Sequence, residues 1–276
     1  FKKLFYIIYC YFYIFILHIY YSINIMNLGV FITCRNGSKR LPGKCNLELV
    51  NKTSYIEYIF RRTKKIKTNC RTILCTTKNK SDSNLIKIAK KNKIDTFRGD
   101  TLDKLKRWKN AAEKFHIDFF ITIDGDDPLF DPQLIDKAFK QYLKNKPDFI
   151  EGKNLICGLF TYGISTKALK KVCKIKNTHK TEMMSIYFTD TGIFNCEQLK
   201  KVNPKYYRND IRLTLDYPED HLFFKTLINY YKKTSFFGTL EILNVVNKYP
   251  KILKINKHKI NEWKNNQLKN TKLILK

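Results

Sequence analysis

The first half of this chain alternates short apolar runs with amphipathic stretches, and this order constrains the fold more than any other feature. Runs with the length and composition of strands occupy residues 28–34, 71–77, 95–97 and 118–123. Apolar residues recur at helical spacing over residues 54–67, 82–92, 102–115 and 133–145. This order predicts an α/β fold of three layers, with helices on both faces of a mainly parallel sheet. Ligands bind such sheets at the carboxyl ends of the strands.

The second half of the chain is less regular. We expect strands at residues 159–164 and 211–215 and a helix over residues 219–231. Because no internal repeat and no Pro/Ser-rich linker interrupts the chain, we assign residues 26–250 to a single domain. Residues 251–276 are rich in Lys and Asn, and we expect a C-terminal tail that is either a peripheral helix or frayed.

Residues 1–25 form a separate hydrophobic segment, most of it uncharged and long enough to span a bilayer. One interpretation is a membrane anchor, for which the positive-inside rule favours a cytoplasmic catalytic domain. A signal peptide fits less well, because the apolar run is overlong and no small-residue cleavage site follows. We favour a third interpretation, translation of AT-rich DNA upstream of a start at Met26. The chain begins with Phe, and Met26 directly precedes the first predicted strand.

The formal net charge of +29 resembles that of a nucleic-acid-binding protein. The lysines are scattered along predicted helices rather than gathered in one stripe, so we expect no nucleic-acid partner. The charge is still expected to attract nucleotides. The eight cysteines include no C-x-x-C pair and no Cys/His spacing suited to zinc, which predicts reduced thiols in a cytoplasmic protein.

The loop after the first predicted strand, RNGSKRLPGK (residues 35–44, hereafter the basic loop), contains several cations and no acid. Its cations are Arg35, Lys39, Arg40 and Lys44. Gly37, Pro42 and Gly43 break regular structure and allow backbone amides to approach a ligand. Cations and exposed amides after a parallel strand suit a triphosphate better than a plain surface turn. The loop is not a Walker A motif, because its glycines are spaced differently and Cys45 replaces the Ser/Thr.

A first acidic motif, IDGDDPLFDP (residues 123–132), places Asp124, Asp126 and Asp127 at the carboxyl end of a predicted strand. Carboxylate oxygens at that position suit Mg²⁺, which takes one or two protein carboxylates together with phosphate oxygens. An acidic cluster alone is weak evidence, since Asp is also common in turns.

A second acidic motif, RLTLDYPED (residues 212–220), combines a predicted strand with a helix that begins at a proline. Asp216 is a candidate metal ligand. Asp220 is a carboxylate at the helix start, where a favourable interaction with the helix N-terminus explains it at least as well as a catalytic role.

These three motifs together resemble the cytidylyltransferase family that makes CMP-activated sugar acids, including the CMP-KDO and CMP-acylneuraminate synthetases. The similarity is greatest to the branch named for spore coat polysaccharide biosynthesis protein F. The segments TTKNKSDSNL (residues 76–85) and FRGDTLDKLKRW (residues 97–108) resemble further motifs of that branch. The resemblance runs from about residue 27 to residue 243. It implies a Rossmann-like nucleotide-diphospho-sugar transferase fold.

The resemblance also implies roles for individual residues. Arg35 and Lys44 would contact the phosphates of CTP, and Ser38 and Arg40 would support the nucleotide. Asp126 and Asp216 would hold Mg²⁺. Arg107 would lie near the site. A homodimer is implied for the assembly.

The chain differs at a few positions from the spore coat polysaccharide biosynthesis protein F branch that it resembles. Thr122 stands where that branch often has Arg, and Asp127 where it has Cys. A Glu-His pair of the branch is reduced here to Glu182 followed by Met183. These departures leave the identity of the acceptor sugar open.

The expected reaction is attack of a sugar-acid hydroxyl on the α-phosphorus of CTP, with pyrophosphate leaving. Such chemistry needs mainly positioning and charge neutralisation. Arg35, Lys44 and Asp126 are the expected catalytic residues, and Asp124 and Asp127 are candidates for the general base by position only. Two alternatives remain open. A nucleotide-sugar glycosyltransferase could use the D-x-D motif of Asp124 and Asp126, and a non-catalytic paralogue could bind nucleotide alone.

Overall fold

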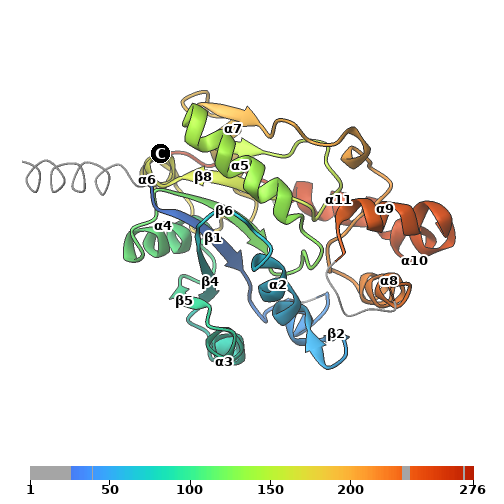
Figure 1. Cartoon of the computed structure of the whole chain (residues 1–276). Helices are drawn as coiled ribbons and strands as arrows, with labels where there is room; N and C mark the ends of the chain where they lie inside the picture. The colour runs from blue at the N-terminus through green and yellow to red at the C-terminus, as the bar shows by residue number, and fades with distance from the viewer. Residues whose placement is uncertain (1–25, 39, 232–236, 270) are drawn as a thin grey trace, which may run out of the picture.

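The computed structural model describes residues 26–276 except Lys39, residues 232–236 and residue 270. The hydrophobic segment of residues 1–25, interpreted above as an upstream translation or an anchor, therefore lies outside the described residues, as does Lys39 of the basic loop. In the described part of the chain, the main sheet has seven strands in the order β5-β4-β1-β6-β8-β7-β9 (Figure 1).

The strands of this sheet are β1 (Leu28–Thr33), β4 (Arg71–Thr77), β5 (Asp95–Gly99), β6 (Phe119–Asp124), β7 (Phe149–Glu151), β8 (Tyr162–Ser165) and β9 (Cys196–Gln198), and a small hairpin pairs β2 (Glu48–Val50) with β3 (Thr53–Ser54). The helices are α2 (Tyr55–Thr63), α3 (Ser83–Lys91), α4 (Lys104–Lys114), α5 (Pro132–Asn145), α6 (Thr166–Ile175), α7 (Ile186–Thr189), α8 (Pro218–Asn229), α9 (Thr239–Lys248), α10 (Lys254–Lys257) and α11 (Lys259–Lys269). Short 3-10 turns are η1 (Lys44–Asn46), η2 (Lys80–Asp82), η3 (Pro204–Tyr206) and η4 (Pro250–Leu253).

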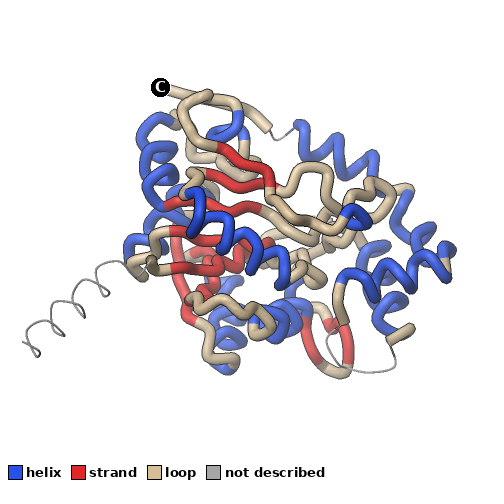
Figure 2. Tube along the Cα trace, turned by 45° about the horizontal axis from the view of Figure 1, so that its top comes forward, coloured by secondary structure: helices blue, strands red, loops and turns tan. Residues whose placement is uncertain are grey.

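The pairing of the strands confirms the predicted fold class. β1 is parallel to β4 and β6, and β4 is parallel to β5, so the first half of the chain forms the expected parallel sheet. β8 runs antiparallel to both β6 and β7, while β7 and β9 are parallel. The sheet is mainly parallel, and Figure 2 shows helices on both of its faces.

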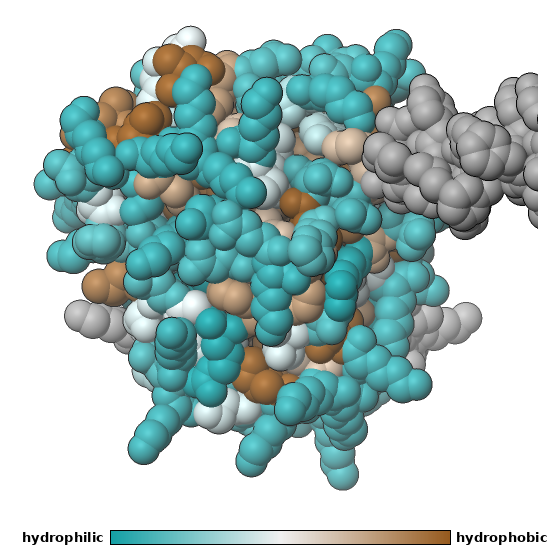
Figure 3. All heavy atoms as spheres, turned by 90° about the vertical axis from the view of Figure 1, so that its left-hand side faces the viewer, coloured by the Kyte–Doolittle hydropathy of each residue, from teal (hydrophilic) through white to brown (hydrophobic). Residues whose placement is uncertain are grey.

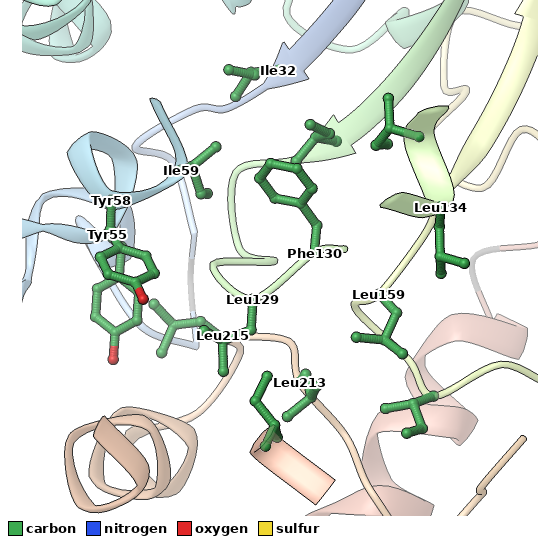
Figure 4. Packing of buried hydrophobic residues seen from close by; sticks show 14 of the residues in the cluster. Ile32, Tyr55, Tyr58, Ile59, Leu129, Phe130, Leu134, Leu159, Leu213 and Leu215 are labelled. Carbon is green, nitrogen blue, oxygen red and sulfur yellow. The ribbon is translucent and has the colours of Figure 1, made fainter. Parts of the chain in front are cut away.

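Each face of the sheet builds its own hydrophobic core, because successive residues of a strand point to opposite faces. Val30 and Ile32 of β1 pack in the larger core, where α2, α5 and α8 contribute. Phe31 packs in the second core with residues of α4 and α6, and its ring stacks on that of Phe120 at 4.1 Å between centroids. Figure 4 shows part of the larger core, in which Ile32 and Phe130 lie near Ile59 of α2.

Local signals fix where several helices begin. Ser54 and Glu57 form a capping box at the start of α2, in which each side chain accepts from the other residue's backbone N–H. The Asp103 side chain accepts from the N–H of Lys106 at the start of α4. Asp131 caps α5, whose first residue is Pro132. These caps place the helix starts within two residues of the predicted ones.

The prediction of a strand at residues 211–215 is wrong. Only Arg212 forms a β-bridge there, with Cys157. The segment is extended, but it pairs with two loops rather than with the sheet. The N–H of Leu213 donates to the carbonyl of Cys157 at 2.8 Å, and the N–H of Leu215 donates to the carbonyl of Asp126 at 2.8 Å. Figure 4 shows Leu213 and Leu215 beside the core residues Leu129 and Leu159.

The strand predicted at residues 159–164 begins later than expected, at Tyr162. The preceding residues turn instead, with the N–H of Leu159 donating to the carbonyl of Ile156. Gly158 lies in this turn with a φ of +93°, where an added Cβ would come within 2.3 Å of the carbonyl oxygen of Leu213. The turn therefore requires glycine in order to meet the segment before α8.

The last segment of the chain packs against the domain. Asn256 of α10 donates from its amide to the carbonyl of Arg212 and to the carboxylate of Asp220. Near the end of the chain, Leu275 forms an antiparallel bridge with Lys176. The C-terminal residues thus contact both the second acidic motif and the segment after α6.

The surface on the side of the strands' amino ends is mostly hydrophilic, with hydrophobic residues visible only as separate spots (Figure 3). Among the residues that the structure describes, no helix has both the length and the apolar content that crossing a bilayer requires.

Candidate active site

The carboxyl ends of β1 and β6 bring the basic loop and the first acidic motif together. β1 and β6 are paired in register up to Thr33 and Asp124. The N–H of Gly125 then donates to the carbonyl of Thr33 at 2.8 Å. A Cβ on Gly125 would lie 2.7 Å from the Cβ of Cys34, so only glycine permits this close approach of the two loops.

The start of the basic loop is fixed by Asp82, a buried residue of η2. Asp82 accepts from the N–H of Asn36 at 2.8 Å and from the hydroxyl groups of Thr76 and Thr77 at the end of β4. The hydroxyl oxygen of Ser38 accepts from the N–H of Leu41 at 3.3 Å and so stabilises a turn within the loop. Asp82 thus ties the start of the basic loop to the end of β4.

Two cations of the basic loop, Arg40 and Lys44, contact carboxylates of the two acidic motifs. The ammonium of Lys44 donates to Oδ2 of Asp126 at 2.5 Å and to Oδ1 of Asp216 at 2.9 Å. The guanidinium of Arg40 donates to the same Oδ1 of Asp216 at 2.6 Å. Lys44 and Asp216 are buried. Four of the predicted site residues, far apart in sequence, therefore form one charged network.

The pKa values of this network shift for physical reasons that differ between its members. Burial raises the pKa of Asp126, and the nearby Asp216 and Asp124 add to this effect against the attraction of Lys44. Burial also opposes ionisation of Asp216, but attraction by Lys44 and Arg40 outweighs it and lowers the pKa of that carboxyl. Burial lowers the pKa of Lys44, but Asp126 and Asp216 outweigh it and raise the pKa overall.

Asp216 is held in place by its neighbour four residues along the chain. The carboxylate of Asp220 accepts from the N–H groups of Asp216 and Tyr217, both at 2.9 Å, at the start of α8. Asp220 is fully buried and pairs with the guanidinium of Arg212. Asp220 is therefore the helix-start carboxylate that the sequence indicated, and it acts by positioning Asp216.

The first acidic motif forms a compact group that we call the carboxylate cluster, namely Asp124, Asp126 and Asp127. Their carboxylate oxygens lie within 4.8 Å of one another. Burial beside Asp126 and Asp124 raises the pKa of Asp127 well above its ordinary range. Hard carboxylate oxygens in this arrangement fit Mg²⁺. The ammonium of Lys44 lies between Asp126 of this cluster and Asp216, so both of these carboxylates are already paired with a cation.

Arg35 and Arg107, which were also expected at the site, lie apart from this network. Arg35 donates to Oε1 of Glu182 at 2.9 Å and to the carbonyl of Thr101 at 3.5 Å. Arg107 is buried and donates to the carbonyl of Asp100 at 2.5 Å. Burial lowers the pKa of Arg107. Arg107 therefore braces the turn between β5 and α4, and its place in nucleotide binding stays a prediction.

Two charged residues at the site were not singled out as site residues from the sequence. Lys104 donates from its ammonium to Oδ1 of Asp124 at 2.9 Å, and Glu182 pairs with Arg35. Lys104 is the first residue of α4, directly after the cap Asp103. No local pattern reveals that this helix start faces the end of β6, because the contact depends on how α4 packs on the sheet.

A sequence profile of the cytidylyltransferase family, described as "Cytidylyltransferase", matches residues 30–259 of the chain. An uncharacterized protein of Methanocaldococcus jannaschii is 31% identical over 228 residues, which cover 82% of this chain and 92% of that protein. The spore coat polysaccharide biosynthesis protein SpsF of Bacillus subtilis is 22% identical over 79% of this chain and 93% of its own length. The 3-deoxy-manno-octulosonate cytidylyltransferase of Solibacter usitatus is 30% identical over 45% of this chain and 48% of its own length.

Solved structures agree with these sequence relatives. A cytidylyltransferase from Leptospira borgpetersenii superposes with a TM-score of 0.76 at 26% identity, covering 83% of this chain and 97% of that one. CMP:2-keto-3-deoxy-manno-octonic acid synthetase, solved with CTP, superposes with a TM-score of 0.57 at 13% identity over 74% of this chain and 99% of its own. The second likeness concerns the fold alone, and it confirms the Rossmann-like arrangement.

Proposed function

The chain belongs to the cytidylyltransferase family and is a nucleotidyltransferase, and we propose that it transfers CMP from CTP to a 2-keto sugar acid, releasing pyrophosphate. One observation carries this proposal, namely the ammonium of Lys44 between the carboxylates of Asp126 and Asp216. It joins the basic loop to both acidic motifs in one network. A triphosphate and a divalent cation each need one half of that network.

In the proposed reaction, an oxygen of the acceptor attacks the α-phosphorus of CTP. A new bond forms between that oxygen and the phosphorus, and the bond from the α-phosphorus to the bridging oxygen breaks, so that the electron pair leaves with pyrophosphate. Arg35, Arg40 and Lys44 neutralise the triphosphate, and Ser38 keeps the basic loop in the conformation that presents them. The acceptor hydroxyl loses its proton in the same step, and Asp124 and Asp127 are the candidate bases because they lie beside Asp126 in the carboxylate cluster.

Asp126 and Asp216 would hold Mg²⁺, with Asp124 and Asp127 in reach, and the ion would neutralise charge on the α-phosphate and the leaving group. Lys44 and Arg40 are paired with these same carboxylates in the structure. The phosphates of CTP therefore compete with Asp126 and Asp216 for both cations.

The acceptor class and the cellular setting are supported by the relatives. One relative is named as a 3-deoxy-manno-octulosonate cytidylyltransferase, which supports a 2-keto sugar acid, and another is named for spore coat polysaccharide biosynthesis, which supports a surface polysaccharide as the end product. We further propose a homodimer in the cytoplasm, by resemblance to the family. Light scattering of the purified chain tests the dimer.

Pyrophosphate release tests the proposed function. The purified chain is incubated with CTP, Mg²⁺ and a panel of 2-keto sugar acids, and we expect release only when an acid acceptor is present. Asp126→Asn is expected to lower kcat by at least about 100-fold, because it removes charge that the transition state needs. Asp95→Asn is the matched control, since Asp95 lies at the amino end of β5 and pairs with Arg71.

Two results would contradict this proposal. Transfer of a sugar from a nucleotide-sugar donor by the same protein would support the glycosyltransferase alternative. CTP binding without turnover, in both the unmodified chain and Asp126→Asn, would support a non-catalytic nucleotide-binding protein.

A further inference from the structure

Lys104 lies on the opposite face of the sheet from Lys44 of the basic loop. Lys44 belongs to η1, and the next residue, Cys45, packs in the larger core with Ile32. Lys104 begins α4, whose Trp108 packs in the second core with Phe31. Since Phe31 and Ile32 are neighbours in β1, they point to opposite faces. The two cations therefore approach the end of the sheet from its two sides.

The carboxylate cluster lies between these two cations. Asp124 ends β6 in register with Thr33 of β1 and continues the alternation that places Phe120 in the second core. Its Oδ1 accepts from the ammonium of Lys104 at 2.9 Å. Asp126, beyond the Gly125 turn, accepts from Lys44.

The reaction geometry gives the two sides different roles. Transfer to the α-phosphorus requires the attacking and leaving oxygens to be roughly in line, on opposite sides of the phosphorus. Arg40 and Lys44 lie on the side of Asp126 and Asp216, where pyrophosphate would leave. Arg35, the first cation of the basic loop, lies instead on the side of Lys104, where it contacts Thr101 and Glu182. In the proposed reaction the acceptor then enters from the side of Lys104.

Lys104 is built to receive an anion. Its side chain is 14% exposed and its ammonium lies 4.8 Å from the centre of the Trp108 ring. The ring is itself held by a hydrogen bond of 2.8 Å from its Nε1 to the hydroxyl of Thr33. An ammonium has three donors. Within the described residues, Asp124 is the one acceptor that Lys104 contacts. A partly desolvated cation with donors to spare attracts a carboxylate strongly.

We propose that Lys104 binds the carboxylate of the acceptor sugar and so makes the enzyme specific for acids. This assignment rests on the proposed function. It goes beyond that function because it names the residue that distinguishes a sugar acid from a neutral sugar. Lys104 positions the acceptor and contacts neither the triphosphate nor pyrophosphate.

Steady-state kinetics with separate variation of CTP and acceptor test this assignment. Lys104→Met is expected to raise the KM for the sugar acid by about 100-fold, the range measured when one partner of a desolvated charge pair is removed, with the KM for CTP nearly unchanged. Lys104→Arg is expected to restore most of the affinity, because it restores the charge. The carboxamide analogue of the same acid is expected to be used equally poorly by the unmodified chain and by Lys104→Met.

Lys106→Met is the matched control, since Lys106 is exposed on the same turn of α4. It is expected to leave both KM values unchanged. If Lys104→Met unfolds at a lower temperature than the unmodified chain, Lys104→Gln carries the same comparison, because it removes the charge but keeps a polar end group that can donate to Asp124.

Three results would overturn the assignment. If Lys104→Met leaves the KM for the acceptor unchanged while the unmodified chain turns over the acid, the role of Lys104 is contradicted and the proposed function is not. A raised KM for CTP places Lys104 with the nucleotide instead. Turnover by the unmodified chain only with neutral or phosphorylated sugars, or no turnover at all, contradicts both Lys104 and the proposed acid acceptor.

Discussion

Asp126 and Asp216 share the ammonium of Lys44, yet their pKa values shift in opposite directions. Asp216 has a second cation, Arg40, and the two together outweigh its burial. Asp126 has only Lys44 among the described cations within ion-pair distance, and it lies close to two further carboxylates. At the scale of single residues, Asp126 and Asp127 are therefore the carboxyl groups whose ionised forms a bound cation would stabilise most.

We predict that Mg²⁺ stabilises the chain more at about pH 8 than at about pH 5. The raised pKa of Asp126 and Asp127 means that the folded chain holds these protons more tightly than the unfolded chain does. Their contribution to stability is thus present below the ordinary carboxyl pKa and is lost as the pH rises through the raised values. Mg²⁺ binds the ionised form and offsets that loss.

The measurement is the difference in Tm between MgCl2 and EDTA across this pH range. Asp126→Asn is expected to reduce the difference, whereas Asp95→Asn leaves it intact. A difference in Tm that is flat, or that shrinks as the pH rises, would contradict the metal assignment.

At the scale of elements, the extended segment before α8 reaches the site because two loops accept it. Leu213 pairs with Cys157, and Leu215 pairs with Asp126. Gly158 permits the first contact through its positive φ and the closeness of the Leu213 carbonyl. The position of Asp216 therefore depends on a turn more than fifty residues earlier in the chain.

We predict that Gly158→Ala destabilises the chain far more than Gly192→Ala. Both glycines have a positive φ, but a Cβ at Gly192 meets open space. Gly192→Ala is expected to cost about 1 kcal/mol from backbone strain alone. Gly158→Ala is expected to cost at least about 2 kcal/mol more, because the backbone of Leu213 must move. Urea denaturation of the two variants measures the difference, and equal costs would show that the turn at Gly158 does not support the segment.

The sequence predicted the elements whose signals are local. β1, β4 and β6 are apolar runs buried on both faces, and capping residues such as Ser54 and Asp131 mark helix starts. The segment 211–215 looked like a strand because its apolar residues alternate with polar ones. In the structure these apolar residues are buried, but they are buried between loops and not in the sheet. β7 and β9 have only three residues each, which is too short to show a period.

The structure brings together those predicted site residues whose motifs directly follow strands. The ends of parallel strands meet at one edge of a sheet, so Lys44 and Asp126 were expected to be close, and the three-motif resemblance added Asp216. The contacts of Lys104 with Asp124 and of Arg35 with Glu182 could not be predicted in this way. They depend on which side of α4 faces the sheet and on how the segment after α6 folds back.

At the scale of the whole molecule, the net charge of +29 and the paired charges of the site have different consequences. The overall charge favours the approach of a tetra-anionic nucleotide from a distance, and salt weakens that effect. The site itself holds Lys44 and Lys104 in ion pairs on the two faces of the sheet, with the carboxylate cluster between them. Under our proposal for Lys104, pyrophosphate leaves on the side of Lys44 and the acceptor enters on the side of Lys104.

The central claim is that the chain joins CMP to a sugar acid, and the fate of labelled phosphorus tests it most directly. CTP is labelled at the α-phosphorus or at the γ-phosphorus and incubated with the chain, Mg²⁺ and a 2-keto sugar acid. The claim predicts the α-label in a sugar ester of CMP and the γ-label in pyrophosphate. An α-label that stays in CDP with the γ-phosphate transferred to the sugar, or that stays in unreacted CTP with every acid, would contradict it.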